Sequence, residues 1–247
     1  GALGEMKKFV LPREYPDIDI NDVHVILAEG SDRLLRTMSK QSSEKARIYL
    51  QQLDVEILLN KTLSSYDGEN AIFSDSEILT TQTVIWTAGI IGEKIKGIPD
   101  EKYNRQRRII TDEYNLVIGF NDIFAIGDIC CINSPQYPNG HPQVAQVAIQ
   151  QARNVAHNLN KLHHHRPFVY NDKGSMATIG RNRAVVDLPY SHFQGRLAWM
   201  IWMFVHLLSM LGMKNKLITF INWVWNYFTY NTSLRLYIRP PKHPVEK

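Results

Sequence analysis

The stretch Ile123-Phe-Ala-Ile-Gly-Asp128 consists of four apolar residues that run directly into a glycine and a carboxylate. A short apolar run of this kind predicts a buried β-strand, here followed at once by a tight turn. Glycine lets a bound molecule approach the backbone closely because it has no side chain. The Asp128 carboxylate can then accept a hydrogen bond from a ribose hydroxyl or a flavin ribityl hydroxyl. The alternative is an ordinary β-turn in which the aspartate only caps a loop.

A helix is predicted downstream, over residues 142–162, because apolar and small residues recur there at helical spacing. Its first turn carries unpaired N–H groups and the positive end of the helix dipole. Directed at a flavin pyrimidine ring, that end would stabilise the anionic reduced form. Gln146 and Gln150 share one face, beside Ala145 and Ala148, whose small side chains leave room for a flat ring. The alternative is a helix buried by its alanines, with two incidental amides.

A β-α-β unit is predicted in the first quarter of the chain. The apolar runs Val23–Ala28 and Val55–Leu59 are expected to form parallel strands, joined by a helix over residues 39–53 with Ser39 as its N-cap. Glu29 closes the first strand, where a carboxylate can accept both ribose hydroxyls of NAD and repel a 2′-phosphate. The glycine-rich turn that usually lies about 20 residues earlier is absent from the sequence. The alternative for Glu29 is a solvated charge at a strand end.

The other predicted elements are short. They are an opening helix followed by a Pro-rich link over Pro12–Pro16, a small antiparallel meander with Asp67-Gly68 at a hairpin turn, strands near Arg108–Thr111 and Leu116–Ile118, and a hairpin over residues 175–188 that turns at Arg181–Arg183.

Two groups of basic residues are weighed as binding groups. Lys173 precedes the predicted hairpin and could reach the N5 and C4 oxygen edge of a flavin, although a solvated surface lysine is the ordinary expectation. His163, His164 and His165 are adjacent and cannot all point one way, so a solvated helix end is favoured over a metal site. No metal is expected.

The composition is that of a folded globular protein: 247 residues, 44% hydrophobic and 21% charged. The net charge of +4 is uneven, because residues 181–247 hold nine Lys and Arg against two acidic residues. Four of the five tryptophans lie in the same segment, so nucleic acid is not the expected partner of this charge. The two cysteines, Cys130 and Cys131, are neighbours, which disfavours a disulfide and favours a reducing compartment.

The last quarter of the chain contains two apolar, aromatic stretches, Leu197–Leu211 and Leu217–Tyr230. A membrane-spanning helix needs about 20 apolar residues, so the first stretch, of fifteen residues, is too short to span. Tryptophan, tyrosine and nearby basic residues instead favour helices that lie in the membrane interface, with the basic side chains near anionic lipid. The basic residues are Lys214, Lys216, Arg235 and Arg239. The alternative is a buried helical hairpin or a dimer interface.

Taken in order along the chain, these motifs resemble the type II NADH dehydrogenases, the single-subunit, non-pumping NADH:quinone oxidoreductases. The segments that carry the resemblance are Val84-Ile-Trp-Thr-Ala-Gly89, Phe124-Ala-Ile-Gly-Asp128, Ala145-Gln-Val-Ala-Ile-Gln150, Asp172-Lys-Gly-Ser-Met-Ala-Thr-Ile-Gly180 and Leu217-Ile-Thr-Phe-Ile-Asn-Trp-Val-Trp-Asn-Tyr-Phe-Thr-Tyr230. The family implies an α/β fold with two dinucleotide-binding domains and C-terminal amphipathic membrane-docking helices. The expected division is residues 1–83 for the partial NADH domain, 84–189 for the C-terminal part of the FAD domain, and 190–247 for membrane docking.

The resemblance also implies a role for each matching residue. FAD would be bound by Gly127, Asp128, Ala145, Gln146 and Lys173, NADH by Glu29, Ala88 and Gly89, and the quinone head and tunnel by Gln146, Gln150 and Met176. The implied partners are NADH, a membrane quinone and surface lipids, with a homodimer and a peripheral, monotopic location on the inner face of the cytoplasmic membrane. No residue other than Lys173, near the flavin, is singled out for the chemistry.

The chain departs from the family pattern at its start. The glycine fingerprints and the first strand of the NADH domain are missing, as is the N-terminal half of the FAD domain. We therefore expect a C-terminal portion that alone neither holds FAD tightly nor turns over. A sulfide:quinone oxidoreductase would need separated redox cysteines, and a thiol-disulphide reductase would need a C-x₄-C motif, so both fit poorly. A non-catalytic membrane-surface module stays open as the alternative.

Overall fold

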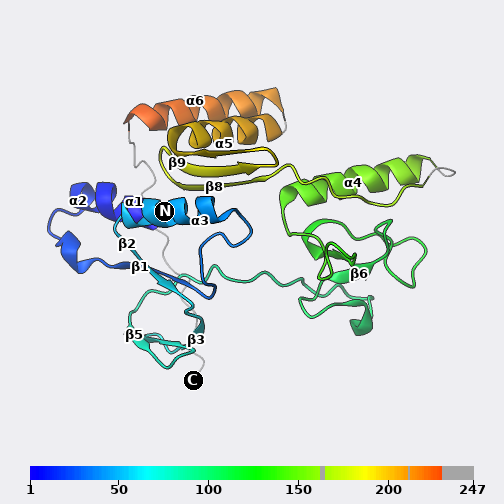
Figure 1. The fold of residues 1–247 in the computed structure, drawn as a ribbon, viewed down its shortest axis with the longest axis horizontal. Helices are drawn as coiled ribbons and strands as arrows, with labels where there is room; N and C mark the ends of the chain where they lie inside the picture. The colour runs from blue at the N-terminus through cyan, green and yellow to red at the C-terminus, as the bar shows by residue number, and fades with distance from the viewer. Residues whose placement is uncertain (162–164, 211, 230–247) are drawn as a thin grey trace, which may run out of the picture. The chain divides into compact units, whose positions relative to one another are not determined.

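The computed structural model describes residues 1–161, 165–210 and 212–229 and divides into two compact units (Figure 1). The first unit contains Gly1–Gln82 and the chain from Gly174 onward, and the second contains Thr83–Lys173. The units differ from the three expected domains in two respects, because residues 174–189 and the expected docking segment from residue 190 onward both group with the N-terminal residues. The three-domain division itself stays a prediction. His163, His164, Tyr230, Arg235 and Arg239, which were weighed above, lie outside the described residues.

The first unit opens with a helical segment that continues through Pro12 to Glu14, where the sequence predicted a link. Pro12 lies at the start of α2, a position where its missing N–H costs little. The N-terminal elements are α1 (Ala2–Glu5), the π-helical turn Met6–Val10, α2 (Leu11–Glu14), the 3₁₀ turn Ile20–Asp22, β1 (Val25–Glu29), α3 (Lys40–Gln51), β2 (Val55–Leu59), β3 (Leu63–Tyr66), β4 (Asn70–Phe73) and β5 (Ile78–Thr80). The C-terminal elements are β8 (Ser175–Gly180), β9 (Arg183–Leu188), β10 (Ser191–Gln194), α5 (Gly195–Ser209) and α6 (Met213–Thr229).

The predicted β-α-β unit is confirmed. Strands β1 and β2 pair in parallel, from Val25 opposite Val55 to Glu29 opposite Leu59. Helix α3 begins after Ser39, whose Oγ accepts the N–H of Ser42 at 3.1 Å, the capping bond expected of an N-cap serine. The antiparallel meander β3-β4-β5 follows β2, as predicted.

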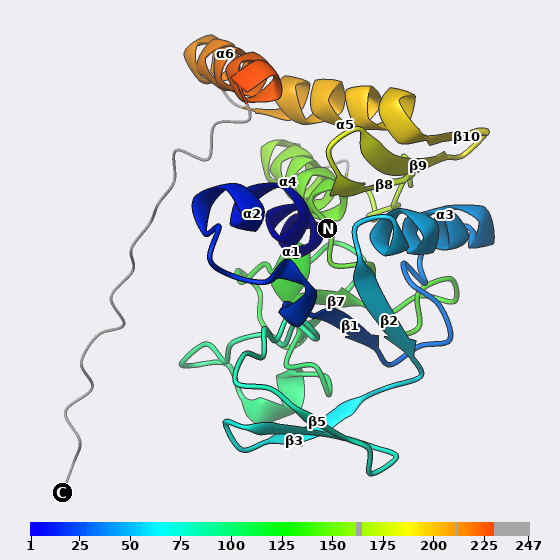
Figure 2. The same ribbon diagram turned by 90° about the vertical axis from the view of Figure 1, so that its left-hand side faces the viewer.

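The predicted hairpin over residues 175–188 is also confirmed, and it gains a third strand to form the sheet β10-β9-β8. This sheet lies between α3 and α5 (Figure 2). Side chains alternate across a strand, so Val185 packs with the α3 core while Ala184 and Val186 pack with Ala198 of α5. All four side chains are fully buried, which shows that both faces of β9 are covered.

The second unit holds a smaller core around a two-stranded parallel sheet. Its elements are the 3₁₀ turn Asp100–Lys102, β6 (Ile109–Thr111), the 3₁₀ turn Gly127–Ile129, β7 (Cys130–Ile132) and α4 (Ala145–Asn160). Its core cluster contains Ile109, Val117, Ala125, Cys130, Ile132, Val147 and Phe168. Helix α4 lies where a helix was predicted.

The strands predicted at Ile123–Ile126 and Leu116–Ile118 are wrong. These segments pair only through single bridges, Leu116 with Phe124 and Thr111 with Val117. Phe124 and Ile126 are each more than a third exposed while Ala125 lies in the core, so the run is only half-buried and not fully buried as its apolar character suggested. The strand that belongs to this motif is β7, which follows the Gly127 turn and does not precede it.

Helices α5 and α6 coincide with the two apolar stretches of the sequence. They have 15 and 17 residues, and within the described part of the chain no helix is both long and apolar enough to cross a membrane. Large apolar side chains nevertheless remain more than half exposed along both helices. They are Leu197, Met200, Phe204, Leu208, Met213, Leu217, Ile221 and Trp225.

Candidate functional site

The turn at Gly127 packs directly against α4. Gly127 has φ +71°, a left-handed conformation that glycine adopts without strain. A Cβ at this position would lie 3.2 Å from Cβ of Ala148, so the turn and the helix approach closely because both residues are small. The next residue, Asp128, is exposed, and Nε2 of Gln143 donates to its main-chain oxygen at 3.1 Å. The turn therefore presents a carboxylate to solvent beside the start of α4.

Helix α4 starts at Ala145 without a side-chain cap. Its N-cap residue, Val144, is extended and provides no capping side chain. The N–H groups of Val147 and Ala148 donate to the Val144 oxygen at 3.0 and 3.4 Å. Ala145 is exposed at this end, where the helix dipole is positive and favours an anionic group.

Gln146 and Gln150 both form hydrogen bonds with residues 171–173. Nε2 of Gln150 donates to the main-chain oxygen of Asn171 at 2.9 Å, and its Oε1 accepts the Asn171 N–H at 3.0 Å. Oε1 of Gln146 accepts the N–H of Lys173 at 3.2 Å, while its Nε2 donates to Oδ1 of Asp172 at 3.4 Å. We name this arrangement the glutamine clasp: Gln146 and Gln150 of α4 holding residues 171–173.

Tyr170 adds a further hydrogen bond to the segment that the glutamine clasp holds. Oη of Tyr170 donates to Oδ1 of Asp172 at 3.4 Å, so Asp172 accepts from both Tyr170 and Gln146. Burial raises the pKa of Tyr170 above its ordinary value, and the charge of Asp172 and the hydrogen bond to it raise it further. Tyr170 therefore stays protonated and acts as a donor at neutral pH.

The structure thus brings together Gln146, Gln150 and Lys173, and it places Gly127 and Asp128 against the same helix. The remaining predicted site residues lie elsewhere. Glu29 and Met176 belong to the first unit, whereas Ala88 and Gly89 are exposed residues of the second, in a segment without helix or strand. A site that combines them stays a prediction.

Glu29 ends β1, as predicted. Its Oε1 accepts both the N–H and the Oγ–H of Ser31, at 2.9 and 2.5 Å, which holds the carboxylate just beyond the strand. Met176 lies on β8 opposite Val186 and packs at the edge of the cluster that α5 covers.

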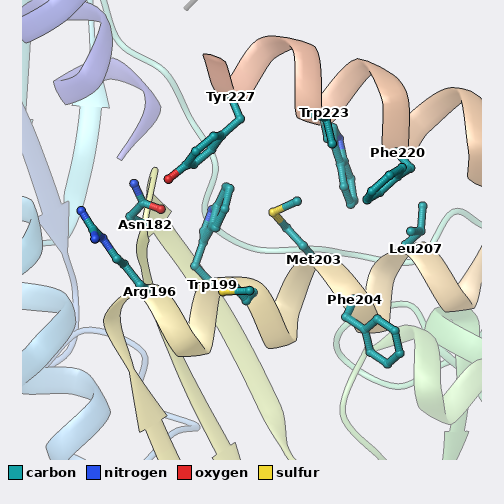
Figure 3. Close-up of a pocket in the computed structure, with 11 residues that line it drawn as sticks. Asn182, Arg196, Trp199, Met203, Phe204, Leu207, Phe220, Trp223 and Tyr227 are labelled. Carbon is teal, nitrogen blue, oxygen red and sulfur yellow. The ribbon is translucent and has the colours of Figure 1, made fainter.

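A groove of about 420 Å³ lies between α5 and α6 (Figure 3). Its walls are almost wholly apolar and aromatic, and the rings of Trp199 and Tyr227 lie 5.7 Å apart between their centres. Arg196 and Asn182 lie together at one end of the groove. The sequence predicted amphipathic helices here but no groove between them.

Two further polar groups were missed by the sequence reasoning. Gln151 is 1% exposed, and its Oε1 accepts the N–H of Gly127 at 2.6 Å. Asp187 accepts bonds from the Ser39 N–H at 2.6 Å and from Oγ of Ser42 at 2.6 Å, and it contacts Nδ1 of His192 at 2.8 Å. The sequence held a signal for Gln151, because Gln151, Asn154 and Asn158 recur at helical spacing with Val147. The structure shows that all four side chains are buried.

Residues 15–152, more than half of the chain, match the sequence profile of the family described as pyridine nucleotide-disulphide oxidoreductase. The chain belongs to this family. Residues 173–230 match a second profile, the NDH2 C-terminal domain. Both matches agree with the resemblance that the sequence motifs indicated.

Two curated proteins are among the relatives to which the chain is similar. The chain is 28% identical over 243 residues to the type II NADH:quinone oxidoreductase Ndh of Mycobacterium tuberculosis, a match that covers 93% of this chain and 51% of the relative. It is 26% identical over 247 residues to the mitochondrial internal alternative NAD(P)H-ubiquinone oxidoreductase A1 of Arabidopsis thaliana, covering 91% and 48%. The chain thus spans about half the length of these curated relatives.

The structure of NDH2 from Plasmodium falciparum in complex with NADH superposes with a TM-score of 0.80 at 21% identity, covering 92% of this chain and 62% of that one. This similarity confirms the predicted fold class, the C-terminal portion of an α/β flavoprotein fold with two dinucleotide-binding domains.

Proposed function

We propose that this chain provides the C-terminal portion of an FAD-dependent NADH:quinone oxidoreductase that pumps no protons. The observation that carries the proposal is the glutamine clasp, which holds Lys173 next to Gln146 on the helix against which the Gly127-Asp128 turn packs. The names of the curated relatives support it. The expected domains are the NADH part at residues 1–83, the FAD part at 84–189 and the membrane-docking part at 190–247.

The residues of the second unit fit a flavin. Gly127 has no side chain and a left-handed backbone, so a cofactor can approach the turn, and the exposed Asp128 carboxylate can accept a ribityl hydroxyl. The open start of α4 at Ala145 can stabilise negative charge on the ring. The chemistry that FAD supplies when bound is to accept a hydride from NADH and to pass two electrons to a quinone. Gly127, Asp128, Ala145, Gln146 and Lys173 would hold it.

Glu29 supports a preference for NADH. Ser31 holds one carboxylate oxygen of Glu29 and leaves the other to accept a ribose hydroxyl, while the negative charge repels a 2′-phosphate. Ala88 and Gly89 would approach the nicotinamide side. Gly89 has φ +77° and no atom within 4 Å of a Cβ built on it, which leaves its backbone open to a ligand.

The quinone would be bound by Gln146, Gln150 and Met176 and would arrive from the membrane. The exposed apolar faces of α5 and α6 would dock on the membrane interface, where tryptophan is favoured and basic side chains contact anionic lipid. We propose a peripheral protein at the inner face of the cytoplasmic membrane, as a homodimer.

Steady-state assays on the intact flavin-loaded protein, of which this chain is the proposed C-terminal portion, test this function. We expect quinone reduction to be much faster with NADH than with NADPH. In Glu29→Gln, the ratio of the rates with NADH and NADPH should fall. Vesicle binding without FAD, NADH or quinone activity would contradict the proposal and favour a non-catalytic membrane-surface module.

A further inference from the structure

We infer that Gln151, oriented by Cys130, is a positioning residue that sets the conformation of the Gly127-Asp128 turn for the flavin. The inference rests on the proposed function, because it concerns how this chain prepares the turn that would bind FAD. Neither Gln151 nor Cys130 was among the predicted site residues.

The contact between Gln151 and the turn is buried and specific. Oε1 of Gln151 accepts the main-chain N–H of Gly127 at 2.6 Å, and both residues are buried. A buried N–H that lacks its acceptor destabilises the conformation that buries it. The left-handed φ of Gly127 therefore depends on a side chain from the neighbouring helix.

Cys130 determines which way the amide of Gln151 points. Nε2 of Gln151 faces Sγ of Cys130 at 3.7 Å, so the oxygen end is left to face Gly127. Nδ2 of Asn115 also donates to this sulfur, at 3.4 Å. A rotated amide would set Nε2 against the Gly127 N–H, placing two donors together. The sulfur thus serves as an acceptor that orients Gln151.

A redox role for Cys130 fits the surroundings less well. The thiol is 1% exposed, and burial raises its pKa above the ordinary value, so the reactive thiolate is disfavoured. Oγ1 of Thr111 lies 3.3 Å from the sulfur and adds a further polar contact. These contacts are those of a structural acceptor.

The consequence concerns Asp128, the residue after Gly127. Gly127–Ile129 forms a single 3₁₀ turn, so the direction in which the Asp128 carboxylate points follows from the backbone of Gly127. Loss of the Gln151 acceptor would let the turn relax and would misplace the carboxylate. Flavin affinity and the electronic surroundings of the flavin would then change together.

The test compares Gln151→Leu with Asn158→Leu, each made in the intact protein of which this chain is the proposed C-terminal portion. Both residues are buried amides of α4, but Asn158 bonds to the main chain of Arg166 and does not contact the turn. Apoprotein is titrated with FAD, and the position of the visible flavin absorption band is recorded. We expect about tenfold weaker FAD binding and a shifted band for Gln151→Leu only.

Equal FAD affinity in Gln151→Leu and Asn158→Leu would overturn the inference. If Gln151→Leu does not fold, Cys130→Ala decides: it removes the acceptor without adding volume, so FAD binding should weaken several-fold, and unchanged binding would overturn the inference. An intact wild-type protein, of which this chain is the proposed C-terminal portion, that binds no FAD would instead refute the proposed function, so the two failures are distinguishable.

Discussion

The main-chain N–H of Lys173 donates a hydrogen bond to Oε1 of Gln146, 3.2 Å away. Gln146 is the second residue of α4, and Lys173 is the last residue of the second unit. The side-chain amide of a helix thus fixes the backbone from which a cationic side chain projects. Gln146 can therefore affect an electron acceptor in two ways, through its own amide and through the placement of Lys173.

Gln146→Ala should slow quinone reduction about tenfold while leaving reduction of the flavin by NADH nearly unchanged. The reason is that the clasp would serve the quinone side of the proposed reaction, whereas hydride would arrive from NADH at the other flavin face. Stopped-flow measurement of the two half-reactions separates them. Asn160→Ala, at the exposed C-terminal end of the same helix, is the control. A larger effect on flavin reduction would remove Gln146 from the quinone site.

Gly127→Ala should lower the free energy of unfolding by about 1–3 kcal/mol, because alanine is strained at φ +71° and its Cβ would press on Ala148. Ala148→Gly in the same chain should recover the steric part, so the double variant should lose less than the sum of the single changes. Urea denaturation of the four proteins completes the cycle. Strict additivity would show that the two residues do not compete for space.

Asp187→Asn should destabilise the first unit by about 1–3 kcal/mol at neutral pH. Burial raises the pKa of Asp187, but hydrogen bonds from Ser42, Ser39 and His192 outweigh it, so the pKa lies below the ordinary value. A lowered pKa stabilises the fold above the unfolded-state pKa of about 3.9, and this stabilisation is lost as pH falls through the folded-state pKa.

The measurement is the free energy of unfolding of wild type and Asp187→Asn between neutral and acid pH. The difference between the two proteins should shrink as pH falls from about 4 through the folded-state pKa, because the carboxylate is protonated first in the unfolded chain and last in the folded one. A difference that stays constant through acid pH would mean that the charge of Asp187 contributes nothing.

Leu208→Glu on α5 and Ile221→Glu on α6 should each weaken binding to anionic lipid vesicles by about tenfold. Both side chains are more than half exposed, and a carboxylate would remove apolar area and add like charge to the anionic surface. Tyr190→Glu, at a fully exposed turn between β9 and β10, makes the same charge change outside the helices. In a vesicle flotation assay, the two helix variants should bind more weakly than Tyr190→Glu. An equal loss of vesicle binding in all three variants would refute docking through α5 and α6.

Periodicity in the sequence predicted the regular elements best. The parallel pair β1-β2, the Ser39 cap, the meander and helix α4 all follow from local patterns of apolar residues and turns. The strand predicted at Ile123–Ile126 was wrong because a strand needs a neighbouring strand to pair with, and local composition does not show which segments lie side by side. The extension of α2 past Pro12 was missed because proline is tolerated at a helix start.

The candidate site was only partly predictable for the same reason. The spacing of Gln146 and Gln150 showed a shared face, but the partners of their amides, residues 171–173, lie more than 20 positions away. Gln151 was overlooked because an amide in an apolar pattern looks like an interruption until its buried partner, Gly127, is located.

The most direct test is an anaerobic experiment on the intact flavin-loaded protein, of which this chain is the proposed C-terminal portion, in which NADH is added first and a quinone second. We expect NADH to bleach the visible flavin band and one equivalent of quinone to restore it. Bleaching by NADH without recovery on addition of quinone, or no bleaching of a stoichiometrically bound flavin, would contradict the proposed function.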